Sequence, residues 1–426
     1  MIDPSNIDSY SLQLVKTLQE GGFKTYFVGG CVRDLILGRR PKDFDIATSA
    51  RPHEIRKLIR RGRLIGKRFK LVLVRHEGHQ FEISTFRSAK ERLDHRGRPD
   101  FNIFGTPEDD AKRRDFTINA LFYDPVTDKV LDYVQGQEDL HRRTLRAIRD
   151  PKITYTEDPI RILRGLRIAG KLGLDINPED YRVMVTRRNF LAETSKDRIR
   201  EEVFKALKEG TTLTFWKWMI RSGSSEYVLP VLSEYSKGEI DDLMSHLSQY
   251  DKSLPFKDFE IGIAVTFLPM ARRLLKGPSR QFSSQQEINA ELNFSQHLKH
   301  NLRYSNQLSE SIAKIFFFWF QIKDRWIDEG VPETQKHRLQ SDPHFVAALQ
   351  LVKLDEQLLG DETPAMRWVD QTLVSCSTSV GSVREMSWRG RRGGQPKPGR
   401  GPGFRPRRRP RRFTTRTPRF RRPPQG

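Results

Sequence analysis

The chain has 426 residues, enough for about three domains of ordinary size, and its 36% hydrophobic content fits a soluble globular protein. It carries 76 Lys and Arg against 54 Asp and Glu; 15 of the positive charges and no negative ones lie between Arg389 and Gly426, so the C-terminal end supplies most of the formal +22. Two cysteines exclude a disulfide framework or a cysteine zinc site, and with an N-terminus unlike a signal peptide they favour a reduced, cytoplasmic setting.

Residues 1–150 alternate between helical and strand patterns. Helices are predicted over 11–23, 31–38 and 53–62, and strands over 24–30, 42–48, 68–76, 80–87 and 120–124. This order predicts an α/β head with a small mixed sheet.

The rest of the chain is predicted to be helical from about residue 151 to about residue 385. The apolar segment 312–320, IAKIFFFWF, predicts a buried core helix. Residues 386–426 are rich in Arg, Pro and Gly, cannot fill a core and are expected to be disordered.

A glycine pair marks the first candidate binding element, in YFVGGCVRDLILG over 26–38. Gly29 and Gly30 end a predicted strand, where glycines let the backbone approach a phosphate closely, and Arg33 lies one turn further on. The alternative is a tight turn with a solvated arginine. The spacing does not match the dinucleotide-binding GxGxxG pattern.

Three carboxylates form the second candidate element. Asp43 and Asp45 are expected on one face of the strand over 42–48, and Glu82 on another strand with Phe81 and Ile83 on the opposite face. Such a set suits two Mg²⁺ ions bound together with a nucleoside triphosphate. A solvated edge strand is the alternative interpretation.

The third element is RRDFTINALFYD over 113–124, in which Asn119 is the polar exception in an apolar stretch. Its function would be to place an arginine on the triphosphate. Alternatively, Asp115 caps a helix and the arginines are solvated.

The helix predicted over 157–174 begins at Pro159, with Asp158 as its expected N-cap. Arg161, Arg164 and Arg167 form a basic stripe on it, which could be a solvated face. Asp158 and Arg161, one turn apart, could instead pair or read a base edge together. Further on, Arg198 and Glu202 are spaced for an intrahelical salt bridge.

Together these stretches resemble the class II nucleotidyltransferases of the polymerase-β superfamily, which include bacterial CCA-adding tRNA nucleotidyltransferases and bacterial poly(A) polymerases. The resemblance covers residues 30–210 and rests on VGGCVRDLILG, KDFDIAT, RRDFTINAL, EDPIRILRGLR and SKDRIREE. It implies a head over 1–150, followed by a helical neck over 151–210 and a helical body and tail region over 211–385. It also implies that Asp43, Asp45 and Glu82 bind Mg²⁺ and that Asp115 supports catalysis. The implied nucleotide-binding residues are Gly29, Gly30, Arg33, Arg114, Asn119, Asp158, Arg161 and Arg164, with Asp158 and Arg161 selecting the base.

Within the family, LIGKRFKLVLV over 64–74, FEISTFR over 81–87 and the Arg- and Pro-rich C-terminal end look like bacterial poly(A) polymerases. The leading hypothesis is therefore Mg²⁺-dependent addition of AMP from ATP to RNA 3′ ends. Addition of CCA to tRNA from CTP and ATP is the alternative. A catalytically inactive RNA-binding protein is a third, which the intact carboxylates disfavour. The positive C-terminal segment, with its phenylalanines, suits RNA binding.

Overall fold

The protein is described from a computed structural model, which covers residues 2–66, 71–88, 103–253, 259–275, 282, 284–300, 302, 304–358 and 363–379. Residues Met1–Val380 form one compact unit, and the second unit, Gly381–Gly426, lies outside the described residues. The disorder expected over 386–426 therefore stays a prediction. Within the part of the chain that is described, no helix is both long and apolar enough to cross a bilayer.

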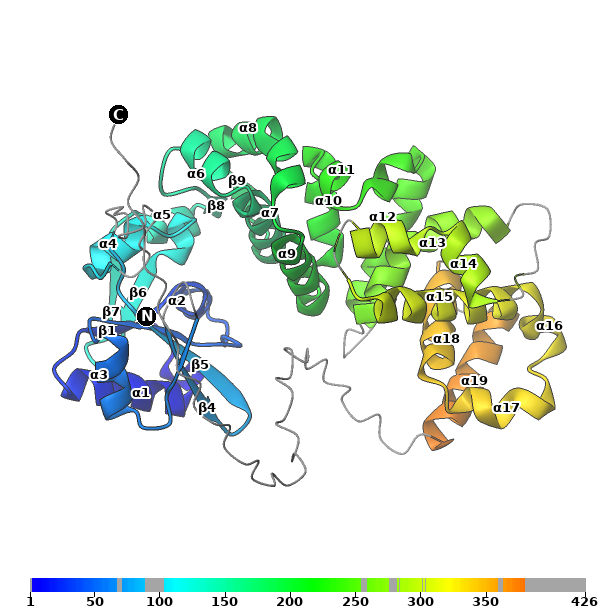
Figure 1. Ribbon diagram of the computed structural model, residues 1–426, viewed down its shortest axis with the longest axis horizontal. Coiled ribbons are helices and arrows are strands. Elements are labelled where there is room, and N and C mark those ends of the chain that lie inside the picture. The colour runs from blue at the N-terminus through cyan, green and yellow to red at the C-terminus, as the bar shows by residue number, and fades with distance from the viewer. Residues whose placement is uncertain are drawn as a thin grey trace, which may run out of the picture. The chain divides into compact units, whose positions relative to one another are not determined.

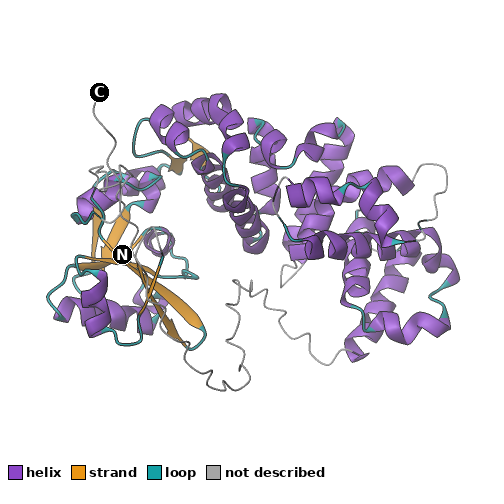
Figure 2. Ribbon diagram, in the orientation of Figure 1, coloured by secondary structure: helices purple, strands orange, loops and turns teal. Residues whose placement is uncertain are grey.

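The N-terminal part is built on a seven-stranded sheet with the strand order β3-β4-β5-β2-β1-β6-β7. Figure 2 shows this sheet in orange and the predominantly helical character of the later part of the chain in purple. β2 runs parallel to β5, whereas the other neighbouring pairs are antiparallel, so the predicted mixed sheet is confirmed. The strands are β1 (Thr25–Val28), β2 (Asp45–Thr48), β3 (Arg63–Ile65), β4 (Leu71–His76), β5 (His79–Thr85), β6 (Leu121–Asp124) and β7 (Lys129–Asp132).

The helices of this part bury apolar side chains against the sheet. They are α1 (Ser9–Glu20), α2 (Gly30–Ile36), α3 (Pro52–Leu58), α4 (Pro107–Lys112) and α5 (Gly136–His141). Leu14 of α1, Val32 of α2 and Ile55 of α3 share one core with Phe27 and Ile46 of the sheet. The predicted helices and strands up to residue 124 thus each have a counterpart, although residues 68–70 of the strand predicted over 68–76 lie outside the described residues. β3 and β7 were not predicted.

The aspartate pair departs from its prediction in one respect. β2 begins only at Asp45, and Asp43 lies in a bend before it. The expectation that both aspartates project from one strand is therefore wrong. The buried Phe44 ring, 5.2 Å from the Phe27 ring, anchors the bend that carries Asp43.

After residue 150 the described residues are almost entirely helical, apart from β9 (Asp175–Ile176), which pairs with β8 (Thr144–Leu145) from before this point. The helices are α6 (Pro151–Glu157), α7 (Ile160–Leu172), α8 (Pro178–Arg187), α9 (Lys196–Glu209), α10 (Thr212–Ser222), α11 (Ser225–Val228), α12 (Lys237–Ser253), α13 (Phe259–Leu275), α14 (Gln285–Glu291), α15 (Asn306–Gln321), α16 (Ile327–Glu329), α17 (Glu333–Gln340), α18 (Pro343–Glu356) and α19 (Pro364–Ser379).

Short 3₁₀ or π segments connect several of these helices. They are Pro4–Asn6, Thr117–Asn119, Arg188–Glu193, Pro230–Glu234, Ser295–His300 and Ile322–Trp326.

Two of these helices confirm predictions about burial. Ile162, Leu166 and Ala169 of α7 are buried, as their spacing predicted. α15 contains the segment 312–320, and its Phe316 and Trp319 are fully buried, so the predicted core helix is confirmed. α7 and α9 lie side by side in Figure 1 and are joined by ion pairs between their polar faces.

Candidate active site

Asp45 and Glu82 are direct neighbours across the parallel strands β2 and β5. Both side chains are exposed, whereas Phe81 and Ile83 are buried on the opposite face of β5. Adjacent strands lie about 4.8 Å apart, so the two carboxylates share one patch of the sheet surface. The opposite-face prediction for Glu82 is therefore confirmed.

The pKa of Asp45 depends on burial and on the charges of the neighbouring site residues. Burial by the surrounding protein raises its pKa to about 6, even though water reaches the side chain; the Arg114 charge opposes this, and Glu82 and Asp43 add to it. Both of the other predicted carboxylates thus act on Asp45. Such repulsion is what a divalent cation relieves, and carboxylate oxygens are the ligands that Mg²⁺ prefers.

The donor chemistry therefore fits a magnesium site. In the described ranges, however, no three His, Cys, Asp or Glu side chains already stand as a preformed set of metal ligands. Asp43, which precedes the strand on an exposed bend, is the member whose position differs most from the prediction.

The glycine turn meets the carboxylates directly. Gly29 has a φ of +78°, a conformation that L side chains rarely adopt. A Cβ added there would lie 3.0 Å from Nη1 of Arg114 and 4.0 Å from Oδ2 of Asp45. Gly30 follows as the first residue of α2. Three separately predicted elements, the turn, the aspartate and the RRDF arginine, thus converge on one spot.

Arg114 is held in place from two sides. Its Nη2 pairs with Oδ2 of Asp110 at 3.0 Å, and its guanidinium carbon lies 5.3 Å from the centroid of the Phe122 ring. Nη1 donates to the Asn119 carbonyl at 3.3 Å. The arginine is therefore partly preorganised beside Gly29.

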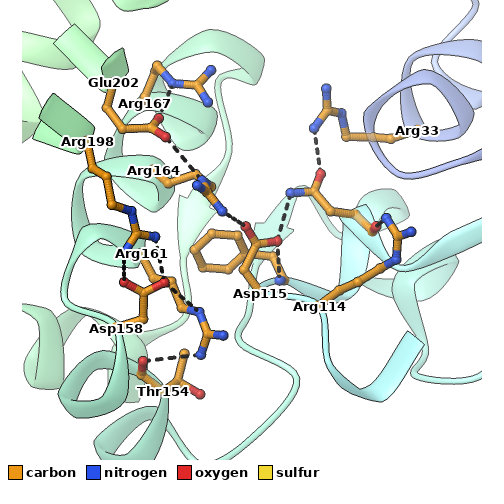
Figure 3. Close-up of polar contacts among 12 residues, drawn as sticks. Arg33, Arg114, Asp115, Thr154, Asp158, Arg161, Arg164, Arg167, Arg198 and Glu202 are labelled. Atoms are coloured by element: carbon orange, nitrogen blue, oxygen red, sulfur yellow. Dashed lines mark hydrogen bonds and ion pairs between the residues drawn. The ribbon is translucent and has the colours of Figure 1, made fainter. Parts of the chain in front are cut away.

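A chain of hydrogen bonds runs from α2 toward the helical part (Figure 3). The buried Arg33 donates to Oδ1 of Asn119 at 2.7 Å and to Asp34, so its guanidinium already has carboxylate and amide partners. Asn119 Nδ2 in turn donates to Oδ1 of Asp115 at 3.2 Å. These two hydrogen bonds explain why the polar Asn119 interrupts the apolar stretch over 116–122.

Asp115 joins this chain to α7. Its Oδ2 accepts from Arg164 at 3.0 Å, and its Oδ1 also accepts from the Phe116 amide at 2.8 Å. The adjacent 3₁₀ turn is capped at Phe116, so the alternative that Asp115 caps a helix is wrong. Burial alone would raise the pKa of Asp115, but the Arg164 charge and these hydrogen bonds hold it below its ordinary value.

The chain continues into α9 through Glu202. This buried carboxylate accepts from Arg164 at 3.2 Å and from Arg167 at 2.8 Å, and Arg167 also reaches Glu209 at 3.1 Å. The predicted salt bridge between Arg198 and Glu202 is wrong, because Glu202 faces α7. Two of the three arginines of the α7 stripe are therefore bound to carboxylates rather than solvated.

Asp158 is the centre of a second cluster. Arg198 of α9 donates to both of its carboxylate oxygens at 2.8 Å, while Arg161 Nε lies 3.9 Å away (Figure 3). Arg161 also donates to the Thr154 carbonyl at 3.4 Å. The prediction that Asp158 caps α7 is wrong: Pro159 precedes the helix, and the carboxylate faces Arg198 instead. The predicted pairing of Asp158 with Arg161 is confirmed as a long contact.

α9 contains three charged residues near the site; sequence reasoning gave Arg198 and Glu202 only a structural role and missed Lys205. Arg198, Glu202 and Lys205 follow one another at intervals of four and three residues, and thus share a face of the helix. The charge of Lys205 acts on Asp45, lowering its pKa against the effect of burial. Helical spacing was the signal that could have identified this face.

Two protein-family models match parts of the chain. Residues 25–146 match the family model described as the poly A polymerase head domain, and residues 173–236 match one described as a probable RNA and SrmB-binding site of polymerase A.

Two curated relatives align with the chain. Poly(A) polymerase I of Salmonella typhi is 36% identical over 58% of this chain and 55% of its own length. A CCA-adding enzyme of Streptococcus suis is 34% identical over 61% of this chain and 62% of its own length. The chain spans about half to three fifths of the length of these relatives.

The fold is also known. The crystal structure of the Bacillus stearothermophilus CCA-adding enzyme in complex with CTP matches with a TM-score of 0.59 and 22% identity, covering 86% of this chain and 82% of that one. The predicted head and helical architecture is therefore confirmed. Residues 25–146 are thus similar to a poly(A) polymerase head domain, and the chain is similar to bacterial poly(A) polymerases I and CCA-adding enzymes.

Proposed function

We propose that the chain is a template-independent poly(A) polymerase, which transfers AMP from ATP to the 3′ end of RNA. The RNA 3′ oxygen would attack the α-phosphorus, and the bond to the β-phosphate would break to release pyrophosphate. The observation that carries this proposal is the meeting of Asp45, Gly29 and Arg114, with Glu82 beside Asp45 in the sheet.

Each member of that group has a task in the proposed reaction. Asp43, Asp45 and Glu82 would hold Mg²⁺, which supplies neutralisation of the triphosphate and activation of the RNA hydroxyl. The absence of a side chain at Gly29 lets phosphate approach the backbone, and Gly30 continues the same turn. Arg114, fixed by Asp110, would bind the triphosphate through its guanidinium.

The neighbouring arginine and amide support this arrangement. Arg33 is buried and bonded to Asn119, and Asn119 is bonded to Asp115. We propose that Arg33 and Asn119 contribute to nucleotide binding by fixing the wall beside Gly30, and that Asp115 positions them together with Arg164.

Base selection is proposed for Asp158 and Arg161, with Arg164 completing the nucleotide-binding side of α7. A carboxylate and a guanidinium offer acceptors and donors that can match a base edge without a template. The pair is close enough to act together, at 3.9 Å.

CCA addition to tRNA is the second candidate, since a CCA-adding enzyme aligns with the chain at 34% identity. The experiment that separates the two uses the full chain with Mg²⁺, a generic RNA, a tRNA lacking its CCA end, and each nucleoside triphosphate separately. We expect repeated AMP incorporation into the generic RNA. Efficient CMP incorporation into the tRNA would favour CCA addition, and no incorporation of any nucleotide would favour an inactive RNA-binding protein.

A further inference from the structure

A cluster of two aromatic rings and one arginine joins α8 to α10, away from the polar chain described above. The guanidinium carbon of Arg221 lies 5.7 Å from the centroid of the Tyr181 ring and 5.2 Å from that of the Trp218 ring. The two rings meet edge to face, with centroids 5.7 Å apart. The Tyr181 hydroxyl donates to the Arg221 carbonyl at 3.2 Å, which fixes the ring to the end of α10.

This cluster differs from the core beside it. Phe215 and Trp216 of α10 are fully buried, whereas Trp218 and Tyr181 are only partly buried and Arg221 is exposed. Tyr181 and Trp218 pack against the edge of the main core and keep part of their surface open to solvent, whereas the exposed Arg221 does not fill that core. Accessible rings and an exposed arginine are also the groups on which unpaired bases stack.

The charge of this surface points to a polyanion. α10 contains Lys217 and Arg221 and no acidic residue, and the two lie four residues apart on one face of the helix. In α8, Arg182 follows Tyr181 in sequence and is exposed, and so is the acidic Glu179 in the first turn of that helix. Among the described residues, no ion pair joins any of these three cations to a carboxylate, in contrast to Arg164, Arg167 and Arg198.

We propose that Tyr181, Trp218 and Arg221 form a binding site for a nucleotide of single-stranded RNA. A base stacks on the accessible part of the Trp218 or Tyr181 ring, or on the plane of the Arg221 guanidinium. Arg221 and Lys217 contact the flanking phosphates. The inference deepens the proposed function by naming where the RNA substrate is gripped. The family model that covers 173–236 is described as a probable RNA and SrmB-binding site, and the cluster lies within it.

Stacking tolerates any base because every base has a π face, so this site would hold RNA without reading its sequence. That property suits an enzyme that acts on many RNA 3′ ends. A protein partner on the same surface is the competing occupant, and the experiment separates the two.

The test measures binding of a fluorescent 15-nucleotide oligo(A) to the full chain without ATP, in a series of salt concentrations. Arg221→Ala should weaken binding about tenfold, and its salt dependence should become shallower because a phosphate contact is lost. Trp218→Phe keeps a ring and should bind nearly as well as the unsubstituted chain, but it should lose part of the tryptophan quenching that oligo(A) causes.

Arg51→Ala is the matched control, since Arg51 is an exposed arginine that lies 5.8 Å from the Phe104 ring centroid in the head. It removes the same charge and the same kind of contact, and should leave binding unchanged. Circular dichroism and thermal melting confirm that each variant is folded. Equal affinities of Arg221→Ala, Arg51→Ala and the unsubstituted chain would overturn the proposal and leave the surface to a protein partner.

The outcome is independent of the catalytic proposal, because binding is measured without nucleotide. At saturating RNA, Arg221→Ala should retain AMP incorporation while the KM for RNA rises. A chain that binds oligo(A) through this site but incorporates no nucleotide would contradict the proposed function and leave the RNA site standing.

Discussion

Arg198 binds Asp158 with both arms of its guanidinium, at 2.8 Å to each carboxylate oxygen. The two residues are 40 positions apart in sequence and join α9 to the start of α7. Arg161, only three residues from Asp158, makes the longer contact of 3.9 Å. The carboxylate proposed to read the base is thus oriented chiefly by a residue of the next helical unit.

From this geometry we infer that Arg198 positions Asp158 for the proposed base selection. Arg198→Ala should leave Asp158 free to rotate, so we expect the KM for ATP to rise about tenfold with little change in kcat, and the preference for ATP over CTP to fall. Steady-state kinetics with both nucleotides measures this. Arg198→Lys, which offers a single donor group, should be intermediate. A lower KM for ATP in Arg198→Ala would mean that Arg198 competes with the base instead.

The paired carboxylates make a separate prediction. Asp45→Asn and Glu82→Gln should each lower AMP incorporation more than about 1000-fold, because the Mg²⁺ ligands that stabilise the triphosphate charge would be lost. Far-ultraviolet circular dichroism should be unchanged, since both side chains are exposed. Glu77→Gln, at the turn between β4 and β5, is the control and should remain active. Activity retained in Asp45→Asn would show that the proposed metal site is wrong.

Local sequence patterns were enough to predict much of the head. The alternation of buried and exposed residues around Glu82 fixed its face, and the glycines placed the turn before α2. The prediction that Asp43 lies in the strand was wrong. Because Phe44 is apolar and buried, the bend before β2 continues the alternation of polar and apolar residues that is typical of a strand. β3 and β7 are short strands with weak apolar patterns, which is why they were not predicted.

The polar contacts could not be predicted as well, because they depend on how elements distant in sequence pack. Helical spacing suggested that Arg198 pairs with Glu202, but Arg198 turns to Asp158, which lies between α6 and α7, and Glu202 turns to Arg164 of α7. A pair at i, i+4 gains little on an exposed helix, whereas leaving the buried Glu202 carboxylate without a charged partner would be costly. Spacing alone identifies the shared face but not the partner.

The C-terminal segment, outside the described residues, provides a prediction about RNA affinity. Deleting residues 386–426 removes 15 Lys and Arg and no acidic residue. We expect weaker binding of oligo(A) and a flatter dependence on salt, because fewer phosphate contacts release fewer counterions. A full-length variant with these arginines changed to glutamine should behave like the deletion. If binding is unchanged across the salt series, the segment serves only to keep the chain soluble.

Glu202 should be essential for the contact between α7 and α9. Glu202→Gln removes the buried charge that Arg164 and Arg167 share and leaves Asp115 and Glu209 as their charged partners, so the free energy of unfolding should fall by about 3 kcal/mol. Chemical denaturation measures the loss. The adjacent Glu201 is exposed, and Glu201→Gln is the matched control, which should change stability by less than about 0.5 kcal/mol. Equal stability of the two variants would show that the arginines find other partners.

The same network predicts how stability depends on pH. Burial alone would raise the pKa of Glu202, but the charges of Arg167 and Arg164 hold it below its ordinary value, and Asp115 is likewise lowered. A carboxyl whose pKa is lowered in the folded state contributes stability above its unfolded pKa, of about 4, and loses that contribution as the pH falls through the folded value. The stability difference between the unsubstituted chain and Glu202→Gln should therefore be constant from pH 6 to 8 and shrink below about pH 4. Thermal melting of both chains across this range measures the difference. A difference that instead shrinks between pH 8 and 6 would mean that a group other than these carboxylates controls the contact between α7 and α9.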